Sequence, residues 1–502
     1  MQIENKSFLK KYLAEITFFS VIFALFFILG YFNHLFDGPG GIHYIRQTDS
    51  LAFIDHYAGN GHNFFKPGTL NLDSEDGNAA CEFPLIYYLI SFLYSGFGKH
   101  YFFLRLVNFL IITVGLFNLF KLGEKTFENK LTAFLPPFFL FTSTVFNYYA
   151  FNYLPDAAAL GFTFVGWNIF YNVYFEKQEG WWKPFLFFTL AGLIKVTYLI
   201  SPIAIVCYFI FKHFKGIKYQ EIKSLIIMFL ISITVVGGWN IYVVFYNHYF
   251  ETEYFTTGAR PIWGMPDSEV TKTWDHIFNF WWNDYFAHSS QHIIAVLLVL
   301  NFILLRKIKN IISLIVLMLM GAVCYFLLFF SQFKDHDYYF LTLIPVITVI
   351  LGGGIYAIIK TSSNKYVNWC MQGTFIIIIL IGINYSREKV NLRFDQRIDH
   401  ISSFSISLEQ NDFEISLIPQ KSKVLVIEDL SKNGSLLILD RKGWTLPDRI
   451  YFTDDTLNHY LNKGLTHIVT PPDLNLEIEH FSRQHYNRSD LGICNIYSFH
   501  YE

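Results

Sequence analysis

Long apolar segments separated by short polar connections dominate the first 385 residues. A helix that crosses a bilayer needs about 20 mostly apolar residues. Segments of this kind are 16–36, 101–121, 131–151, 156–175, 222–246, 290–305, 310–332, 338–359 and 366–385. Residues 83–97 are too short to cross, which predicts an interfacial helix. Residues 184–211 are too long for one span, which favours a hairpin of two short helices.

The lysines and arginines support this assignment of the spans. With it, every predicted cytoplasmic segment carries at least one of them, namely 1–15, 122–130, 176–183, 212–223, 306–309 and 360–365. Cytoplasmic connections are enriched in these residues. We therefore predict about eleven spans, with the N-terminus in the cytoplasm and the C-terminus outside. Residues 16–36 have no small-residue cleavage site behind them, which predicts a signal anchor.

The C-terminal residues 386–502 differ in kind. They are mixed and polar, and they contain short β-like runs at 423–429, 465–472 and 494–501. This pattern predicts a small α/β domain on the non-cytoplasmic side. The expected domains are therefore residues 1–385, with a first outer loop at 37–100, and residues 386–502.

Composition excludes a soluble globular protein. Hydrophobic residues make up 53% of the 502-residue chain, and charged residues only 16%, against about 25% in soluble domains. The five cysteines show no metal-ligand spacing and no disulfide pattern. The chain is therefore expected to be an integral membrane protein.

Candidate chemistry gathers on the predicted outer side rather than inside the spans. The residues are Asp49, Asp55, Glu82, Asp156, Arg260 and His336. Ion pumps and transporters commonly place polar groups at mid-membrane instead. The one-sided distribution suggests an enzyme whose substrate is presented at the surface by a lipid, with a soluble outer substrate as the alternative.

Asp49 is the candidate general base, because a desolvated carboxylate near a membrane has a tuned pKa. A helical spacing of six residues rotates Asp55 by about 600°, so the two acids do not share one helical face. One is then expected to point into a cavity and the other to solvent. The alternative is a solvated loop acid or a helix N-cap at Thr48 or Asp49, and this stretch alone favours it.

Glu82 and Asp156 each lie at the start of a predicted helix. A carboxylate there suits the positive end of the helix dipole, so capping explains both positions. The functional alternative gives Glu82 a hydrogen bond to a sugar or a shared cation. For Asp156, which follows Pro155, capping and function are equally supported.

Basic and aromatic residues supply candidates for substrate binding. Lys195 lies between two short apolar helices, where it must be paired or reach water. Binding a lipid phosphate and snorkelling to the surface both satisfy that need. Arg260 is a second phosphate candidate, with an ordinary loop arginine as the alternative. His336 either contacts a ligand or lies at the interface, while Tyr338 and Tyr339 also suit the aromatic belt.

Short motifs in a fixed order resemble the GT-C membrane glycosyltransferases. The resemblance covers residues 10–385 and is closest to the branch with protein O-mannosyltransferases and the lipid A aminoarabinose transferase. The motifs are "RQTD" (46–49), "EFPLIYYL" (82–89), "FG" (97–98), "RL" (105–106), "YLPDAAAL" (153–160), "LIKVTYL" (193–199) and "HDYYFLTLIP" (336–345). The C-terminal domain matches bacterial relatives only loosely, through "DRKGW" (440–444).

The resemblance implies transfer of a sugar from a polyprenyl-phosphate carrier to a lipid, glycan or protein acceptor, with inversion at the anomeric carbon. The enzyme would lie in a bacterial inner membrane and act on its non-cytoplasmic face. Asp49 is similar to the base, and Lys195 and Arg260 are the candidates for holding the donor phosphate. Arg46 belongs to the same first-loop motif. Ser50 follows Asp49 where the mannosyltransferases have glutamate, so the acceptor class is open.

Two other functions remain open at this point. One is a flippase or transporter of lipid-linked sugars, and the other is an oligosaccharide ligase or polymerase that uses a pyrophosphate-linked donor. No cofactor is firmly implied beyond the polyprenyl-phosphate sugar, and no nucleic acid is expected. Glu82 and His336 are residue types that can bind a divalent cation, although no spacing in the sequence argues for such a site.

Overall fold

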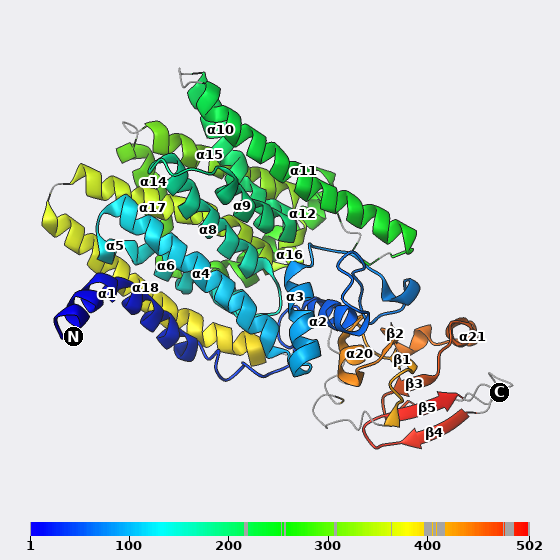
Figure 1. Cartoon of the computed structure of the whole chain (residues 1–502). Coiled ribbons are helices and arrows are strands. Elements are labelled where there is room, and N and C mark those ends of the chain that lie inside the picture. The colour runs from blue at the N-terminus through cyan, green and yellow to red at the C-terminus, as the bar shows by residue number, and fades with distance from the viewer. Residues whose placement is uncertain are drawn as a thin grey trace. The chain divides into compact units, whose positions relative to one another are not determined.

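The computed structural model describes residues 2–214, 219–252, 254–255, 258–305, 309–362, 364–395, 404, 408, 417–474, 476 and 486–499 (Figure 1). The chain divides into two compact units. The helical unit comprises Met1–Leu35, Arg105–Asn240 and Thr257–Arg393. The mixed unit comprises Phe36–Leu104, Ile241–Thr256 and Phe394–Glu502. The first loop is thus grouped with the C-terminal residues, whereas the sequence placed it with the spans.

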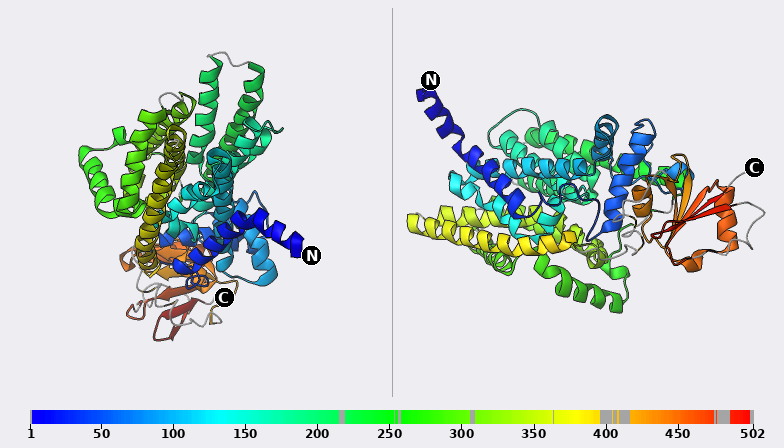
Figure 2. Two further views of the ribbon diagram at one scale, coloured as in Figure 1. Left: turned by 90° about the vertical axis from the view of Figure 1, so that its left-hand side faces the viewer. Right: turned by 90° about the horizontal axis from the view of Figure 1, so that it is seen from below.

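Long apolar helices make up most of the helical unit (Figure 1 and Figure 2). They are α1 (Gln2–Ile28), α4 (Phe102–Phe127), α8 (Asp156–Tyr174), α9 (Trp182–Ile194), α10 (Ile200–His213), α11 (Tyr219–Tyr249), α14 (His288–Leu304), α15 (Lys309–Leu328), α17 (Ile344–Thr361) and α18 (Lys365–Asp395). Shorter helices are α5 (Lys130–Ala133), α6 (Leu135–Phe139), α7 (Thr144–Ala150), α12 (Asp267–His276), α13 (Trp282–Tyr285) and α16 (Gln332–Asp335).

Seven helices among the described residues are long and apolar enough to cross a membrane, and eight if a bent pair is one span. That pair is Asp267–Tyr285 and His288–Leu304, bent by 93°. The predicted count of about eleven also used segments that are shorter in the structure. Residues 131–151 form α5, α6 and α7 instead of one helix. Pro136 and Pro137 lie in α6, and proline cannot donate the hydrogen bond that would continue a helix.

The predicted α/β domain is confirmed by a five-stranded sheet in the mixed unit. Its strand order is β2-β1-β3-β5-β4. The strands are β1 (Lys423–Ile427), β2 (Lys442–Leu446), β3 (His467–Thr470), β4 (Tyr486–Asp490) and β5 (Asn495–Phe499). Strand β1 is parallel to β2 and β3, and β5 is antiparallel to β3 and β4. Helices α20 (Gly434–Leu439) and α21 (Asp454–Asn462) belong to the same domain.

The first loop extends this sheet. The backbone N–H of Leu72 donates to the Gly443 carbonyl at 2.7 Å, and the Gly443 N–H donates to Leu70 at 3.1 Å. The indole of Trp444 also donates to the Leu72 carbonyl, at 2.9 Å. A Cβ on Gly443 would lie 1.8 Å from the Val424 carbonyl oxygen, so only glycine allows this close approach. These contacts explain why the loop and the C-terminal domain form one unit.

The rest of the first loop is helical. It contains α2 (Tyr44–Gly59), the short 3₁₀ helix Glu75–Gly77 and α3 (Leu85–Phe97). Helix α3 has the short length that residues 83–97 predicted, and it contacts α2. Helix α2 in turn contacts α20 of the C-terminal domain. The loop therefore carries the "RQTD" residues on a helix that is buried inside the mixed unit.

Candidate functional site

Asp49 is buried in α2 and receives hydrogen bonds from two distant segments. The residue is only 2% exposed. The Tyr254 hydroxyl donates to Oδ1 at 3.0 Å and to Oδ2 at 2.8 Å. The Asn433 amide donates to Oδ1 at 2.8 Å. Because α2 begins at Tyr44, Asp49 lies inside the helix, and the N-cap alternative is wrong.

Arg46 and Glu82 form a half-buried ion pair, and Arg46 lies about one helical turn before Asp49. The Arg46 guanidinium bonds Glu82, and the Tyr87 hydroxyl donates to the same Glu82 oxygen at 2.5 Å. The hydroxyls of Tyr87 and Ser50 lie 3.0 Å apart. The three predicted residues Arg46, Asp49 and Glu82 are therefore brought together. Glu82 precedes α3 and pairs with a side chain, so helix capping does not describe its contacts.

The pKa values of the two carboxylates in this cluster, Asp49 and Glu82, are shifted in opposite directions. Burial raises the pKa of Asp49 to about 6, although Arg46 and the hydrogen bonds from Asn433 and Tyr254 act against the rise. Burial also acts to raise the pKa of Glu82, but the charge of Arg46 and the hydrogen bonds from Cys81, Tyr87 and Arg46 together outweigh it and lower the value to about 2. Asp49 therefore exchanges a proton near neutral pH, while Glu82 stays ionised as a partner of Arg46.

Asp55 lies apart from this cluster on the same helix. Its carboxylate is 3.3 Å from the Lys99 ammonium, and Lys99 also pairs with Asp440. Asp49 bonds Tyr254 and Asn433 while Asp55 pairs with Lys99, so the two acids have different surroundings. The expectation that one of them faces solvent is wrong, because both residues are buried. Burial raises the pKa of Asp55 to about 6 as well.

A second cluster in the helical unit contains Asp156 and Lys195. The two form a salt bridge, and the Lys195 ammonium lies 4.7 Å from the Tyr338 ring centre and 4.2 Å from that of Tyr339. Cation–π contacts of this kind contribute about 0.5–2 kcal/mol. The His336 ring stacks on Tyr339 with centroids 5.9 Å apart. These five predicted residues are therefore neighbours in the fold.

Breaks in helices position this second cluster. Lys195 has an extended backbone between α9 and the 3₁₀ helix Val196–Leu199. Asp156 is the first residue of α8, and Tyr338 and Tyr339 lie in the 3₁₀ helix Asp337–Leu343. The Lys195 side chain is 16% exposed, so it is paired rather than left alone in an apolar region. The sequence placed a lysine between two helices but gave no sign of its partners.

A buried ionic network next to this cluster was missed by sequence reasoning. Arg393 in α18 bonds Asp337 at 2.6 Å and Asp284 at 2.6 Å. The Tyr149 hydroxyl donates to Asp337 at 2.5 Å. Asp337 is the residue between His336 and Tyr338, so the network holds the segment that carries both. The signal for this network in the sequence was Arg393, a charged residue that follows the last apolar segment, 366–385.

Arg260 belongs to neither cluster. It follows α11 in a loop of the helical unit, where its side chain is exposed. Tyr87, Tyr254 and Asn433 are the functional candidates that sequence reasoning missed in the mixed unit. Tyr254 and Asn433 lie 205 and 384 positions after Asp49 in the chain. Tyr87 lies 38 positions after Asp49, within the "EFPLIYYL" motif. No local pattern distinguishes Tyr254 or Asn433 from other loop residues.

Metal binding by Glu82 and His336 finds no support in the geometry. Arg46 and Tyr87 bond the Glu82 carboxylate, and the His336 ring stacks on Tyr339. Within the described ranges, no group of three or more His, Cys, Asp or Glu side chains is arranged to hold a metal ion.

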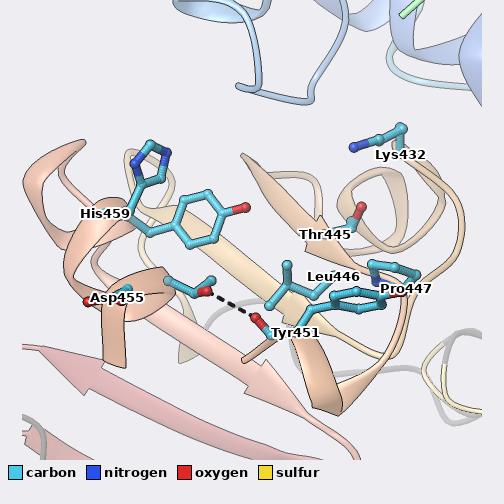
Figure 3. Close-up of a pocket in the computed structure, with 9 residues that line it drawn as sticks. Lys432, Thr445, Leu446, Pro447, Tyr451, Asp455 and His459 are labelled. Atoms are coloured by element: carbon cyan, nitrogen blue, oxygen red, sulfur yellow. Dashed lines mark hydrogen bonds between the residues drawn. The ribbon is translucent and has the colours of Figure 1, made fainter. Parts of the chain in front are cut away.

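The C-terminal domain has a hollow of its own, with a volume of about 560 Å³. Its lining includes Thr445 and Leu446 at the end of β2, and Tyr451, Asp455 and His459 from the segment through α21 (Figure 3). The carboxyl ends of parallel strands are a common place for ligands. None of the residues predicted from the sequence lies in this hollow.

Comparison with known proteins identifies the fold. The chain matches the solved structure of ArnT from Cupriavidus metallidurans in the apo state with a TM-score of 0.60, over 96% of this chain and 97% of ArnT, at 10% sequence identity. The chain has the GT-C fold. The predicted fold class is thereby confirmed. The structure of the same ArnT bound to undecaprenyl phosphate gives a TM-score of 0.59 at 10% identity and the same coverage.

Other comparisons agree with this fold. The apo oligosaccharyltransferase of Archaeoglobus fulgidus matches with a TM-score of 0.55 at 11% identity, over 93% of this chain and 70% of that one. The sequence profile of the dolichyl-phosphate-mannose-protein mannosyltransferase family matches residues 81–239. No curated protein matches the chain in sequence. The matched residues include Glu82, Asp156 and Lys195.

Proposed function

We propose that this GT-C protein is a glycosyltransferase that moves a sugar from a polyprenyl-phosphate carrier to an acceptor on the non-cytoplasmic face of the membrane. The acceptor is a lipid, a glycan or a protein. The proposal is supported by the mannosyltransferase profile and by the fold shared with ArnT, one structure of which holds undecaprenyl phosphate. The proposed setting is a bacterial inner membrane, with the N-terminus in the cytoplasm and the C-terminal domain outside.

The observation that carries the proposal is the environment of Asp49. Its carboxylate is buried, and its pKa is raised to about 6 by burial, which suits a general base near neutral pH. A carboxylate offers about four lone-pair positions. The single Tyr254 proton is shared between Oδ1 and Oδ2, and Asn433 donates to Oδ1. These two donors do not use all the lone pairs, so Oδ2 can accept the proton of an acceptor hydroxyl.

The proposed step is an inverting displacement. The acceptor oxygen attacks the anomeric carbon of the donor sugar, and the bond from that carbon to the phosphate oxygen breaks. Asp49 takes the proton of the acceptor hydroxyl as the new bond forms. The polyprenyl phosphate leaves with the bonding electron pair.

The departing phosphate gains negative charge, so a fixed cation beside it lowers the barrier. Lys195 is the first candidate, because Asp156, Tyr338 and Tyr339 hold its ammonium in place while 16% of its side chain stays exposed. Arg260 is the second, since its exposed loop position leaves it accessible.

The remaining predicted residues are assigned to holding the sugar and the base. Arg46 and Glu82 fix the environment of Asp49, and Asp156, His336, Tyr338 and Tyr339 surround Lys195. Aromatic rings and charged groups of this kind bind sugar faces and hydroxyls.

A second candidate function is transfer of an oligosaccharide from a pyrophosphate-linked lipid. The likeness to the oligosaccharyltransferase of Archaeoglobus fulgidus favours it. The two candidates share a base and differ in the donor, so they are separated by supplying monophosphate-linked and pyrophosphate-linked sugars to the same preparation.

The test measures sugar transfer by the purified protein in lipid nanodiscs, with a panel of polyprenyl-monophosphate sugars and an extract of envelope glycans as acceptors. Asp49→Asn is compared with Asp55→Asn. Asp55 is a matched control, because it is buried in the same helix with its pKa raised by burial to about 6, yet it pairs with Lys99. Removing a base lowers the rate about 10²–10⁴-fold.

Transfer by the wild type and by Asp55→Asn, but not by Asp49→Asn, supports the proposal. A transfer rate in Asp49→Asn equal to that of the wild type and of Asp55→Asn would exclude Asp49 as the base. Movement of the intact lipid-linked sugar between leaflets, without transfer, would instead identify a flippase.

A further inference from the structure

The helical unit contains an elongated cavity whose lining includes none of the residues proposed for catalysis or donor binding. It has a volume of about 500 Å³ and is lined by α4, α8, α10, α15 and α17. Helix α8 contacts α17, and α15 contacts both α10 and α17. We call it the α17 cavity, because α17 lines it from Pro345 to Lys360. Fifteen residues of helix span about 22 Å, so the cavity is long and narrow.

The wall of the α17 cavity is apolar over most of its length. Its lining includes Phe164, Trp167 and Phe170 of α8 and Ile205 and Phe209 of α10. Gly352 leaves part of the wall open, since a Cβ there would meet no atom within 4 Å. The neighbouring Gly353 is different, because a Cβ there would lie 2.6 Å from the Asn301 side chain. The space beside Gly352 is therefore unfilled by the protein.

Three lysines lie at one end of this cavity. Lys125, Lys212 and Lys360 come from the last turns of α4, α10 and α17. Lys212 lies 4.9 Å from the Tyr208 ring centre, and Lys360 lies 5.6 Å from that of Tyr356. Rings and lysines in this arrangement are typical of the level where a membrane meets water.

The acidic partners at this end are few. Glu128 lines the cavity, but its side chain is 80% exposed and its oxygen is 3.9 Å from Lys360. Glu176 lies 3.9 Å from Lys125. Lys125 also donates to the amide oxygen of Asn168 at 3.3 Å. The described residues that line this end are three lysines and one glutamate, so the lining carries a net positive charge.

We propose that the α17 cavity binds one anionic phospholipid. An acyl chain lies along the apolar wall past Gly352, and the phosphate lies among Lys125, Lys212 and Lys360. Basic pockets between membrane helices bind acidic head groups in this way. The connections 122–130, 212–223 and 360–365 adjoin these helix ends and carry the lysines that predict the cytoplasmic side, so the lipid belongs to the cytoplasmic leaflet. The proposal is independent of the proposed catalytic step.

The experiment measures phospholipid retained by the full-length protein after purification in detergent, by native mass spectrometry, and then rebinding of phosphatidylglycerol or phosphatidylcholine. Gly352→Leu fills the open wall, and Gly373→Leu is its control. Gly373 is also a half-buried helical glycine whose Cβ would meet nothing within 4 Å, but it lies outside the cavity. Lys212→Gln combined with Lys360→Gln removes charge without changing the wall.

The expected result is one retained phosphatidylglycerol per chain in the wild type and in Gly373→Leu. Gly352→Leu loses it, and the double lysine variant rebinds phosphatidylglycerol about 30-fold more weakly, because each lysine near an acidic lipid contributes about 5-fold. Retention of phosphatidylcholine to the same extent, of a polyprenyl phosphate in place of the phospholipid, or of phosphatidylglycerol by Gly352→Leu would each overturn the proposal. The double lysine variant provides this test even if Gly352→Leu fails to fold.

Discussion

Replacing Tyr254 by phenylalanine tests the role of Asp49 without touching the carboxylate itself. The Tyr254 hydroxyl is 3.0 and 2.8 Å from the two Asp49 oxygens. A hydrogen bond to a charged group contributes about 1.5–3 kcal/mol, and one pKa unit corresponds to about 1.36 kcal/mol. Loss of the donor disfavours the ionised form and raises the pKa of Asp49 by about 1–2 units, from about 6 to about 7–8.

The sign of the effect on rate follows from the proposed chemistry. Asp49 accepts a proton only when it is ionised, so kcat/KM rises with pH through the pKa of Asp49. At pH 7 the ionised fraction falls from about 90% in the wild type to about 10–50% in Tyr254→Phe. We therefore expect kcat/KM to fall about 2–10-fold at pH 7 and to approach the wild-type value on the alkaline plateau.

The assay is sugar transfer in nanodiscs between pH 5 and pH 9, pH values that bracket the pKa of about 6. Tyr246→Phe is the matched control, because its hydroxyl donates to the Pro67 carbonyl at 2.8 Å in the same unit and does not bond Asp49. Its pH profile should equal that of the wild type. An acid limb that stays in place in Tyr254→Phe, or an equal drop in rate at every pH, would refute the reasoning.

The remaining predictions concern the two clusters and the sheet. Glu82→Gln leaves the half-buried Arg46 guanidinium without its anion, so the free energy of unfolding should fall by about 1–3 kcal/mol, measured as thermal unfolding in detergent; an unchanged melting temperature would contradict the ion pair. Lys195→Met should raise the KM for the donor more than it lowers kcat, and adding Asp156→Asn should restore stability but not donor binding; recovery of the donor KM in the double variant would exclude Lys195 as a phosphate ligand. Gly443→Ala should destabilise the mixed unit by about 1–3 kcal/mol, because its Cβ would overlap the backbone of β1; limited proteolysis that leaves the C-terminal domain as resistant as in the wild type would contradict the overlap.

The pattern of apolar residues determined that the chain is a membrane protein with a small α/β domain after its helices. Apolar runs are local, and their length measures directly whether a helix crosses a bilayer. The number of spans was less secure, since residues 131–151 are apolar throughout yet contain Pro136 and Pro137 in a broken helical segment. Composition cannot report a break that depends on backbone hydrogen bonds.

The local motifs also pointed to Arg46, Asp49 and Glu82, and to Asp156, Lys195, His336, Tyr338 and Tyr339. The order of motifs and the outer side of each span were enough to single these out. Their grouping into two clusters, with Lys195 paired to Asp156 and Arg46 paired to Glu82, required coordinates.

Only the tertiary structure decided how each carboxylate behaves. Asp49 and Glu82 are both acids beside one arginine, yet the pKa of one is raised and that of the other is lowered, because Glu82 holds the ion pair while burial dominates at Asp49. The groups that bond Asp49 come from Tyr254 and Asn433, hundreds of positions away in the chain. The sequence determined which residues were available, and long-range packing determined which of them surround the carboxylate.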